Sequence, residues 1–290
     1  WSAEREVSLR SGSACADAIQ DRYNVVRIDV GRDVVEKLRE AKPDAALNML
    51  HGPFGEDGGM QAILEFLEIP YSHSGVLASA LAMNKSRARD VFKAAGIPVA
   101  DGEVVSRFEA AREHVLIPPY VLKPISNGSS VGVYIVREGD EPPPELSADD
   151  WKYGEHVLAE TYIAGKELTC AVIGDHALDV IEITSDLQFY DYEAKYAPGG
   201  SKHILPAPIP ADIYKQVQTI TLQAHNALGC RGVSRSDFRY DPDTDRLVCL
   251  ETNTQPGMTA TSLVPEMAAY AGMPFPDLVS WMIEDASLDR

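Results

Sequence analysis

The chain has 290 residues, of which 45% are hydrophobic and 24% charged, proportions that are ordinary for a globular protein of two domains or three small ones. Its formal net charge of −18 argues against a nucleic-acid partner, because a phosphate backbone binds a basic face. No apolar run approaches the ~20 residues of a spanning helix and no signal-like segment opens the chain, so we expect no membrane partner. Reduced thiols and a cytoplasmic location are indicated by four scattered cysteines that form no C-x-x-C pair, namely Cys15, Cys170, Cys230 and Cys249.

The first 75 residues alternate predicted helices and strands. The pattern predicts helices near 3–20, 32–41 and 60–67 and strands near 24–30 and 45–50. Such alternation predicts a parallel sheet with helices on both faces. Because the first helix starts directly after Trp1, we expect that the first strand of this sheet is missing from the chain.

The pattern changes after a further helical region, 76–96, which stops at Gly96-Ile97-Pro98. The rest of the chain predicts a largely antiparallel α+β region with short strands at 120–123, 131–136, 157–160, 167–173 and 177–183. Residues 196–210 contain too many glycines and prolines for regular structure. They predict a lid that closes over a site, with an ordinary surface loop as the alternative.

Two apolar strands near the end of the chain are joined by the turn 241–243 and carry Asp237, Glu251 and Asn253. Alternation sends Glu251 and Asn253 to one face, and pairing through the turn puts Asp237 opposite them. Two carboxylates and an amide oxygen suit Mg²⁺, which takes such ligands together with substrate phosphates. Arg235 shares the face of Asp237 and offers a planar cation to an oxyanion or phosphate. This region therefore predicts an enzyme that handles a magnesium–nucleotide complex.

Two loops are further candidates. Residues 123–132 form a small-residue loop whose N–H groups and hydroxyls can cradle phosphates, although the loop lacks the Walker A pattern and its Asn127-Gly128 pair is also typical of a hairpin turn. Residues 51–59 follow a predicted strand and precede a helix, which is where α/β sheets place binding loops. His51 either contacts a substrate there or caps the sheet edge. On residue type alone, surface charges are expected at Glu4, Glu56, Asp57 and Lys85.

The chain resembles the D-alanine–D-alanine ligases of bacterial cell-wall synthesis, which have the ATP-grasp fold. The resemblance covers essentially the whole chain and depends on ordered motifs: Ser-Ala-Glu-Arg-Glu-Val-Ser, His-Gly-x-x-Gly-Glu-Asp-Gly, Gly-Ser-Ser-Val-Gly, Tyr-Asp-Tyr-Glu-Ala-Lys-Tyr, Arg-x-Asp-Phe, Glu-x-Asn-Thr-x-Pro-Gly-Met-Thr and Ser-Leu-Val-Pro. It implies an N-terminal α/β substrate-side domain, a central ATP-grasp subdomain with the phosphate loop, and a C-terminal ATP-grasp subdomain with the metal site and lid, at 1–75, 76–159 and 160–290 respectively.

The resemblance implies ATP and Mg²⁺ or Mn²⁺, with two ions, as cofactors. The metal ligands would be Asp237, Glu251 and Asn253. ATP would contact the phosphate lysines Lys85 and Lys123, the loop residues Ser129 and Ser130, the adenine hinge Glu160, Thr161, Tyr162 and Ile163, the ribose ligand Glu167, and Phe189.

The implied substrates are ATP and D-alanine, and the implied assembly is a homodimer. D-alanine would contact Glu4, His51, Lys195, Arg235, Ser262 and Leu263, and the catalytic set would be Glu4, Ser129, Tyr196 and Arg235. The chain departs from the family pattern in the absent strand before Trp1, in Asn127 in place of the usual Glu, and in Ser234 in place of the usual Gly.

The implied reaction moves the γ-phosphoryl of ATP to the carboxylate of one D-alanine, and the amine of a second D-alanine then attacks the acyl phosphate. Positioning and charge neutralisation would drive the first step, Arg235 would stabilise the oxyanion, and a closed lid would exclude water. One alternative is another ATP-grasp ligase that uses D-lactate, against which Tyr196 speaks. The other is a nucleotide-binding protein without turnover.

Overall fold

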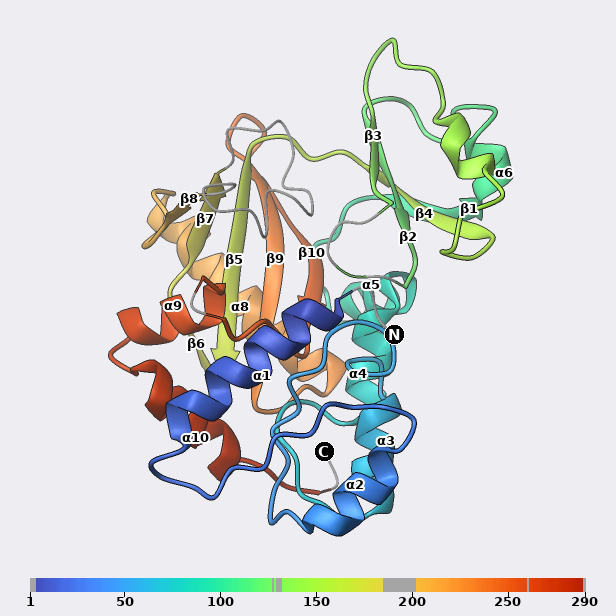
Figure 1. The fold of residues 1–290 in the computed structure, drawn as a ribbon. Helices are drawn as coiled ribbons and strands as arrows, with labels where there is room; N and C mark the ends of the chain where they lie inside the picture. The colour runs from blue at the N-terminus through green and yellow to red at the C-terminus, as the bar shows by residue number, and fades with distance from the viewer. Residues whose placement is uncertain (1–3, 127, 129–131, 185–201, 260, 289–290) are drawn as a thin grey trace.

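The computed structural model describes residues 4–126, 128, 132–184, 202–259 and 261–288 (Figure 1). Its α-helices are α1 (Arg5–Ile19), α2 (Val34–Ala41), α3 (Gly59–Phe66), α4 (Val76–Met83), α5 (Lys85–Ala94), α6 (Arg107–Ala110), α8 (Ala211–Leu228), α9 (Leu263–Tyr270) and α10 (Phe275–Glu284), with a 3₁₀ turn, η1 (Pro144–Ser147). Its strands are β1 (Gly102–Ser106), β2 (Tyr120–Pro124), β3 (Tyr134–Val136), β4 (His156–Thr161), β5 (Lys166–Ile173), β6 (His176–Ala177), β7 (Ile181–Thr184), β8 (Lys202–Ile204), β9 (Val233–Asp241) and β10 (Arg246–Asn253). No helix in the described ranges is long and apolar enough to cross a bilayer.

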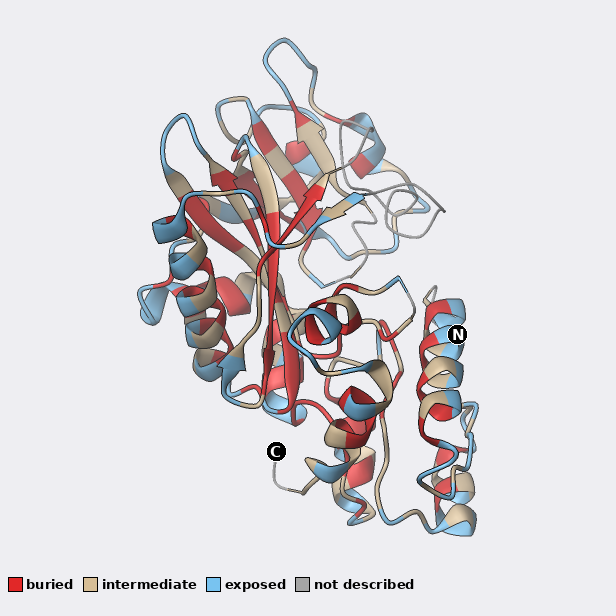
Figure 2. Cartoon of the chain, turned by 90° about the vertical axis from the view of Figure 1, so that its left-hand side faces the viewer, coloured by how far each residue is buried: buried red, intermediate tan, exposed pale blue. Residues whose placement is uncertain are grey.

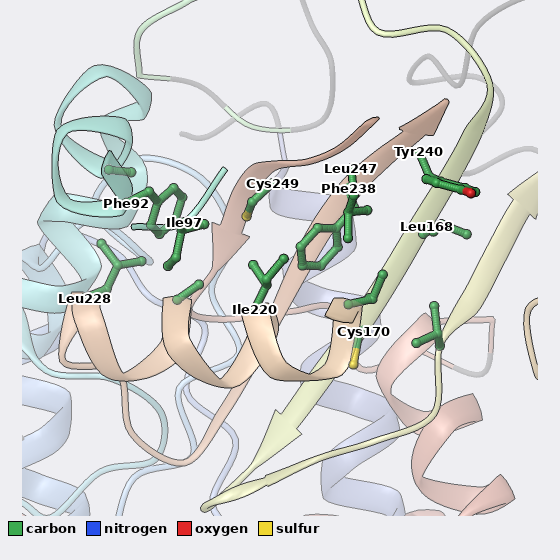
Figure 3. Packing of buried hydrophobic residues seen from close by; sticks show 14 of the residues in the cluster. Phe92, Ile97, Leu168, Cys170, Ile220, Leu228, Phe238, Tyr240, Leu247 and Cys249 are labelled. Carbon is green, nitrogen blue, oxygen red and sulfur yellow. The ribbon is translucent and has the colours of Figure 1, made fainter. Parts of the chain in front are cut away.

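The larger sheet has the order β10-β9-β5-β7-β8, with β6 paired to β5, and every pairing in it is antiparallel. Helix α8 covers one face of this sheet, and Figure 3 shows its apolar side chains against those of the strands. The helix is amphipathic, with buried side chains every three or four residues, at Ile213, Val217, Ile220, Ala224 and Leu228. Burying a large side chain such as Phe238 in this layer stabilises the fold by about 1.5–3 kcal/mol.

The opposite face of the larger sheet is covered by α1, α9 and α10. Cys15 and Ile19 of α1 pack there with Val264 and Leu278 of the two C-terminal helices. In Figure 2 the buried strands lie between helices whose outer sides are exposed. Helices from the first and last parts of the described chain therefore pack together on one face of the sheet.

The smaller sheet has the order β1-β4-β2-β3 and is also antiparallel throughout. It forms a separate lobe, at the upper right of Figure 1. Its own apolar cluster contains Tyr120, Leu122 and Leu146, all fully buried. The prediction of antiparallel sheets after residue 96 is thereby confirmed, although sequence analysis missed β1 and predicted one strand over 177–183 where β6 and β7 are separate.

The prediction of a parallel sheet in the first 75 residues is wrong for the described structure. Residues 24–30 and 45–50 form no strand, and the parallel pairing there is a single bridge between Ala46 and Tyr71. Alternating apolar residues report which side of a segment is buried, not whether a neighbouring strand supplies hydrogen bonds. Ile28 and Val30 pack against a small cluster around Leu38, whereas Val26 stays 59% exposed.

Two further expectations are corrected. Residues 202–204, predicted to lack regular structure, form the edge strand β8, which pairs with β7 through Thr184↔Lys202 and Glu182↔Ile204. The prolines at 206, 208 and 210 do not prevent it, because the strand ends at Ile204, before the first of them. The helical region 76–96 is two helices, because Asn84 leaves the helical conformation and its side chain caps α5 by accepting from the Arg87 N–H. The domain boundaries at 75/76 and 159/160 stay predictions.

Candidate active site

Strands β9 and β10 place four polar side chains on one face of the larger sheet. The predicted pairing of the two strands is confirmed, with Asp237 opposite Glu251 and Arg235 opposite Asn253, although the turn lies at 242–245 and not at 241–243. Side chains of directly opposed residues point to the same side of an antiparallel pair. The intervening residues of β9 point the other way, into the layer under α8.

A β-bulge gives β10 this arrangement. The register shifts between Cys249, which opposes Phe238, and Glu251, which opposes Asp237, so that Leu250 is an extra residue. Cys249 and Phe238 both lie in the cluster beneath α8. If the strand ran through Leu250 without a bulge, strict alternation would send Cys249 and Glu251, two residues apart, to the same face. The bulge therefore lets the strand bury a cysteine on one side and present a carboxylate on the other.

The Asp237 carboxylate has four neighbouring donors. Arg235 grips it with both Nε (2.9 Å) and Nη2 (2.7 Å), in the forked geometry that a guanidinium forms with a carboxylate. The Asn253 side-chain N–H donates to it at 3.1 Å, and the Thr169 hydroxyl donates from β5 at 2.6 Å. These contacts fix the carboxylate and the guanidinium relative to each other.

Lys85 reaches the same face from another element. It is the first residue of α5, and its Nζ lies 3.0 Å from Glu251 Oε2. The lysine and carboxylate side chains are 13% and 27% exposed. The expectation of a solvated helix cation, based on residue type alone, is therefore wrong, and the cluster contains two carboxylates balanced by two cations.

The remaining residues that are candidates for binding the nucleotide lie in the strands β2, β4 and β5 or in the link between β4 and β5. Lys123 of β2 and Glu160 of β4 form a buried ion pair. After β4, the Tyr162 N–H donates to the carbonyl of Pro119, and the Ile163 carbonyl accepts from Arg239 Nε at 3.1 Å. Thr161 ends β4, and its N–H donates to the carbonyl of Asp101 at 2.8 Å.

Arg239 is a residue that sequence analysis missed. Besides Ile163, it donates to the Gly165 carbonyl at 2.8 Å and lies 3.6 Å from Glu167 Oε2. It therefore ties the link between β4 and β5 to β9. Its place two residues after Asp237 on the same face of β9 was the signal that would have found it.

Glu4 lies at the start of α1, beside the small-residue loop. A Cβ added to Gly128 would stand 3.3 Å from Glu4 Oε1, so the loop backbone and this carboxylate are neighbours. Ser129 and Ser130, which belong to the same loop, lie outside the described residues, as do Phe189, Lys195, Tyr196 and Asn127. The lid predicted at 196–210 is described only from 202 onward.

His51 is buried behind the start of α1, and the nearby Glu56 side chain is 15% exposed. The Ser11 hydroxyl lies 3.2 Å from His51 Nε2, and the Ser8 hydroxyl accepts from the His51 N–H at 2.9 Å. Burial lowers the pKa of His51 to about 4, with a smaller contribution from the charge of Arg235, so that the imidazole is neutral at pH 7. The histidine therefore offers a hydrogen bond rather than a charge.

Glu56 is the second missed residue. Burial, with smaller contributions from the charges of Glu4 and Glu251, raises its pKa from 4.5 to about 8, although the Gly52 N–H and Lys85 act in the opposite direction. One oxygen accepts the Gly52 N–H at 2.8 Å. Glu56 thus lies among residues from α1, α5 and β10, and the expectation of a surface charge is wrong for it. Its place in the loop 51–59 was the available signal.

The last two candidate substrate-binding residues, Ser262 and Leu263, lie at the start of α9. Ser262 precedes the helix, and its Oγ accepts the Thr259 N–H at 2.9 Å. Leu263 is the first helical residue, with its side chain buried in the core, so any contact it makes with a small ligand is through its backbone N–H at the helix N-terminus.

The oxygen donors fit a hard cation. Asp237 and Glu251 face each other across the hairpin, and the Asn253 amide lies beside them. No three His, Cys, Asp or Glu side chains gather into a possible metal site anywhere in the described ranges, which agrees with a set of two acids and an amide. Carboxylate and amide oxygens are the ligands that Mg²⁺ accepts.

Comparisons with known proteins agree with this geometry. A family model described as "D-ala D-ala ligase C-terminus" matches residues 91–284. Proteins named D-alanine--D-alanine ligase from Xanthobacter autotrophicus and Rhodopseudomonas palustris are 65% and 63% identical over 295 residues, which is 100% of this chain and 96% of each relative. The solved D-alanine--D-alanine ligase of Bacillus anthracis has a TM-score of 0.81 at 31% identity, covering 98% of this chain and 94% of that one. Its complex with ATP has a TM-score of 0.82 at 29% identity with the same coverage.

The two antiparallel sheets, the polar cluster on the larger one and the match to a ligase solved with ATP define an ATP-grasp enzyme that uses ATP. Within that class, the chain belongs to the D-alanine–D-alanine ligase family.

Proposed function

We propose that this protein joins two D-alanines to D-alanyl-D-alanine at the expense of ATP, for the synthesis of peptidoglycan precursors. The observation that carries the proposal is the single polar face formed by Arg235, Asp237, Glu251 and Asn253, with Lys85 reaching it from α5. That face combines oxygen donors for a cation with cations for phosphate and oxyanion. The names of the relatives supply the substrate.

ATP is proposed to bind between the two sheets. Lys85 and Lys123 contact its phosphates, and the loop that contains Ser129 and Ser130 covers them. The end of β4 and the link after it (Glu160, Thr161, Tyr162 and Ile163) hold the adenine, with Glu167 at the ribose and Phe189 nearby. Arg239 supports this arrangement because it fixes the link through two carbonyls.

Asp237, Glu251 and Asn253 are proposed to hold two metal ions, either Mg²⁺ or Mn²⁺. When bound, the metal supplies charge neutralisation for the phosphates. The protein's contribution is to present both carboxylates in register on rigid strands. Arg235 and Lys85 already neutralise these carboxylates in part, and both become available to phosphate oxygens nearby.

The first D-alanine is proposed to bind with Glu4, His51, Lys195, Ser262 and the Leu263 N–H around it. Its carboxylate attacks the γ-phosphorus of ATP, and ADP leaves. The amine of the second D-alanine then attacks the acyl carbon, a tetrahedral oxyanion forms and phosphate departs. Arg235 stabilises that oxyanion. Glu4, Ser129 and Tyr196 are proposed to connect the phosphate loop (123–132) and the lid (196–210) to the start of α1 during catalysis. The enzyme is proposed to work as a homodimer in the cytoplasm.

Dependence of ADP release on D-alanine and on Mg²⁺ tests the proposal. ADP should appear only with both present, and L-alanine should not replace D-alanine. Equal release of ADP without any amino acid would contradict the proposed ligase activity. Ester formation with D-lactate as readily as peptide formation would instead favour the depsipeptide alternative.

A further inference from the structure

Glu160 is the centre of a buried charge triad that joins three elements. Its Oε1 lies 3.0 Å from Arg89 Nε of α5, and its Oε2 forms an ion pair with Lys123 Nζ of β2. The Arg89, Glu160 and Lys123 side chains are 5%, 6% and 10% exposed. Charged groups so deeply buried need partners, because removing an ion from water is costly.

Arg89 is anchored independently of the carboxylate. Its Nη2 donates to the carbonyl of Ala100, in the segment that joins α5 to β1, at 2.8 Å and lies 3.3 Å from the carbonyl of Gly102, the first residue of β1. Gly102 pairs with Glu160 in the smaller sheet, and a Cβ added to Gly102 would collide with the Ala159 carbonyl at 2.1 Å. The guanidinium is therefore held by backbone on one side of Glu160, while Lys123 approaches from another strand.

The net charge of the buried group depends on Arg89, and this charge affects how strongly the group attracts a phosphate. An isolated Lys123–Glu160 pair would be neutral, so the lysine would offer little net attraction to a phosphate. With Arg89 present the triad has two cations for one anion and a net charge of +1. In addition, Glu160 keeps a cation when Lys123 turns toward an anion, so the lysine can move without leaving a buried carboxylate uncompensated.

We propose that Arg89 is a positioning residue for ATP binding, which shares the Glu160 carboxylate and so leaves the charge of Lys123 available to the nucleotide phosphates. Arg89 does not itself touch the nucleotide. The inference depends on the proposed phosphate-binding role of Lys123. The experiment therefore distinguishes a failure of the Arg89 proposal from a failure of the Lys123 proposal.

The test measures the KM for ATP, the KM for D-alanine and the thermal midpoint of Arg89→Met in the full chain. The KM for ATP should rise about tenfold, the worth of one buried charge contact, with the KM for D-alanine within twofold of wild type. Arg89→Lys, which keeps the charge, should recover most of the loss. Arg87→Met is the matched control, since it removes a 71% exposed cation from the same helix and should behave as wild type.

A double-mutant cycle with Glu160→Gln shows whether the effect passes through the carboxylate. In the Glu160→Gln background the lysine is no longer neutralised, so adding Arg89→Met should change the KM for ATP by less than threefold. If Arg89→Met does not fold, Arg89→Gln takes its place, because it leaves a neutral Lys123–Glu160 pair and a donor for the carbonyls.

Three results would overturn the inference. A folded Arg89 variant with wild-type KM for ATP would reduce Arg89 to a structural tie. A tenfold loss in the Glu160→Gln background as well would show that Glu160 is not the intermediary. Lys123→Met separates the two proposals: if it too leaves the KM for ATP unchanged, the phosphate role of Lys123 has failed, and with it the basis of the inference.

Discussion

Asp237 and Glu251 stand directly opposite each other in the β9–β10 ladder, and their carboxylates point to the same face of the larger sheet. Each is paired with a cation from a different place in the chain, Asp237 with Arg235 two residues before it and Glu251 with Lys85 at the start of α5. The pairing of the two strands therefore holds both carboxylates side by side on one face, where a metal ion can bind them.

Asp237→Asn and Glu251→Gln should each lower turnover by about a hundredfold or more, because each removes a charged oxygen ligand worth several kcal/mol from the proposed metal site. Both substitutions keep the side-chain shape, so circular dichroism should show an intact fold. Steady-state ADP release at saturating Mg²⁺ is the measurement. Near-normal rates in both variants would mean that the metal site lies elsewhere.

Arg235→Met should lower kcat by about 10²–10³ while changing the KM for ATP far less, because an oxyanion contact acts mainly in the transition state. Arg246→Met is a suitable control, since Arg246 is a partly exposed cation beside the turn of the same hairpin, at the other end from Arg235, and is paired with Asp101. Equal loss of kcat in the control, or a loss confined to the KM for ATP, would contradict the assigned role.

Glu56 should make the protein less stable as the pH rises. Its pKa is raised from 4.5 to about 8 in the folded protein, so the folded state binds more protons than the unfolded state between these values, and the free energy of unfolding falls through that window. Glu56→Gln removes the titration. Its free energy of unfolding relative to wild type should increase from pH 5 to pH 8 by on the order of a few kcal/mol.

Urea unfolding at the two pH values measures this difference. Glu6→Gln, which changes an 80% exposed carboxylate on α1, should show no such trend. A pH-independent difference for Glu56→Gln would show that Glu56 is ionised in the fold at neutral pH.

Ser234, which stands where the family usually has glycine, should contribute to stability rather than catalysis. Its hydroxyl lies 2.8 Å from His225 Nδ1, both residues are buried, and burial lowers the pKa of His225 to about 4. Ser234→Gly should lower the free energy of unfolding by about 1–3 kcal/mol, since it leaves a buried ring nitrogen without this contact. Because Ser234 faces α8 and not the polar face, kcat should stay at the wild-type value.

The His225→Leu background provides the control, because there is then no imidazole to satisfy. The cost of Ser234→Gly should be clearly smaller in that background. The same cost in both would attribute the loss to the added glycine flexibility alone.

The hairpin part of the site was predictable from sequence because its geometry is local. A short turn fixes the pairing of β9 with β10, and alternation then decides which side chains share a face. The bulge at Leu250 did not spoil the prediction, since it precedes Glu251 and leaves the step from Glu251 to Asn253 intact.

Contacts between distant segments were not predictable in this way. The pairing of Lys85 with Glu251 and the burial of Glu56 depend on how α5, α1 and the loop 51–59 pack on the larger sheet, which no local pattern encodes. The segment 24–30 was mistaken for a strand because its apolar side chains alternate, although hydrogen bonding decides strand formation. The edge strand β8 was missed for a different reason, since the prolines that argued against regular structure lie beyond its last residue, Ile204.

The fate of the carboxylate oxygen of D-alanine tests the central claim, ligation through an acyl phosphate, most directly. With both carboxylate oxygens of D-alanine labelled with ¹⁸O, one labelled oxygen becomes bonded to phosphorus in the first step and leaves with phosphate in the second. Mass spectrometry of the released phosphate should therefore find one ¹⁸O for each D-alanyl-D-alanine formed. Unlabelled phosphate, or ADP release without dipeptide, would contradict the account.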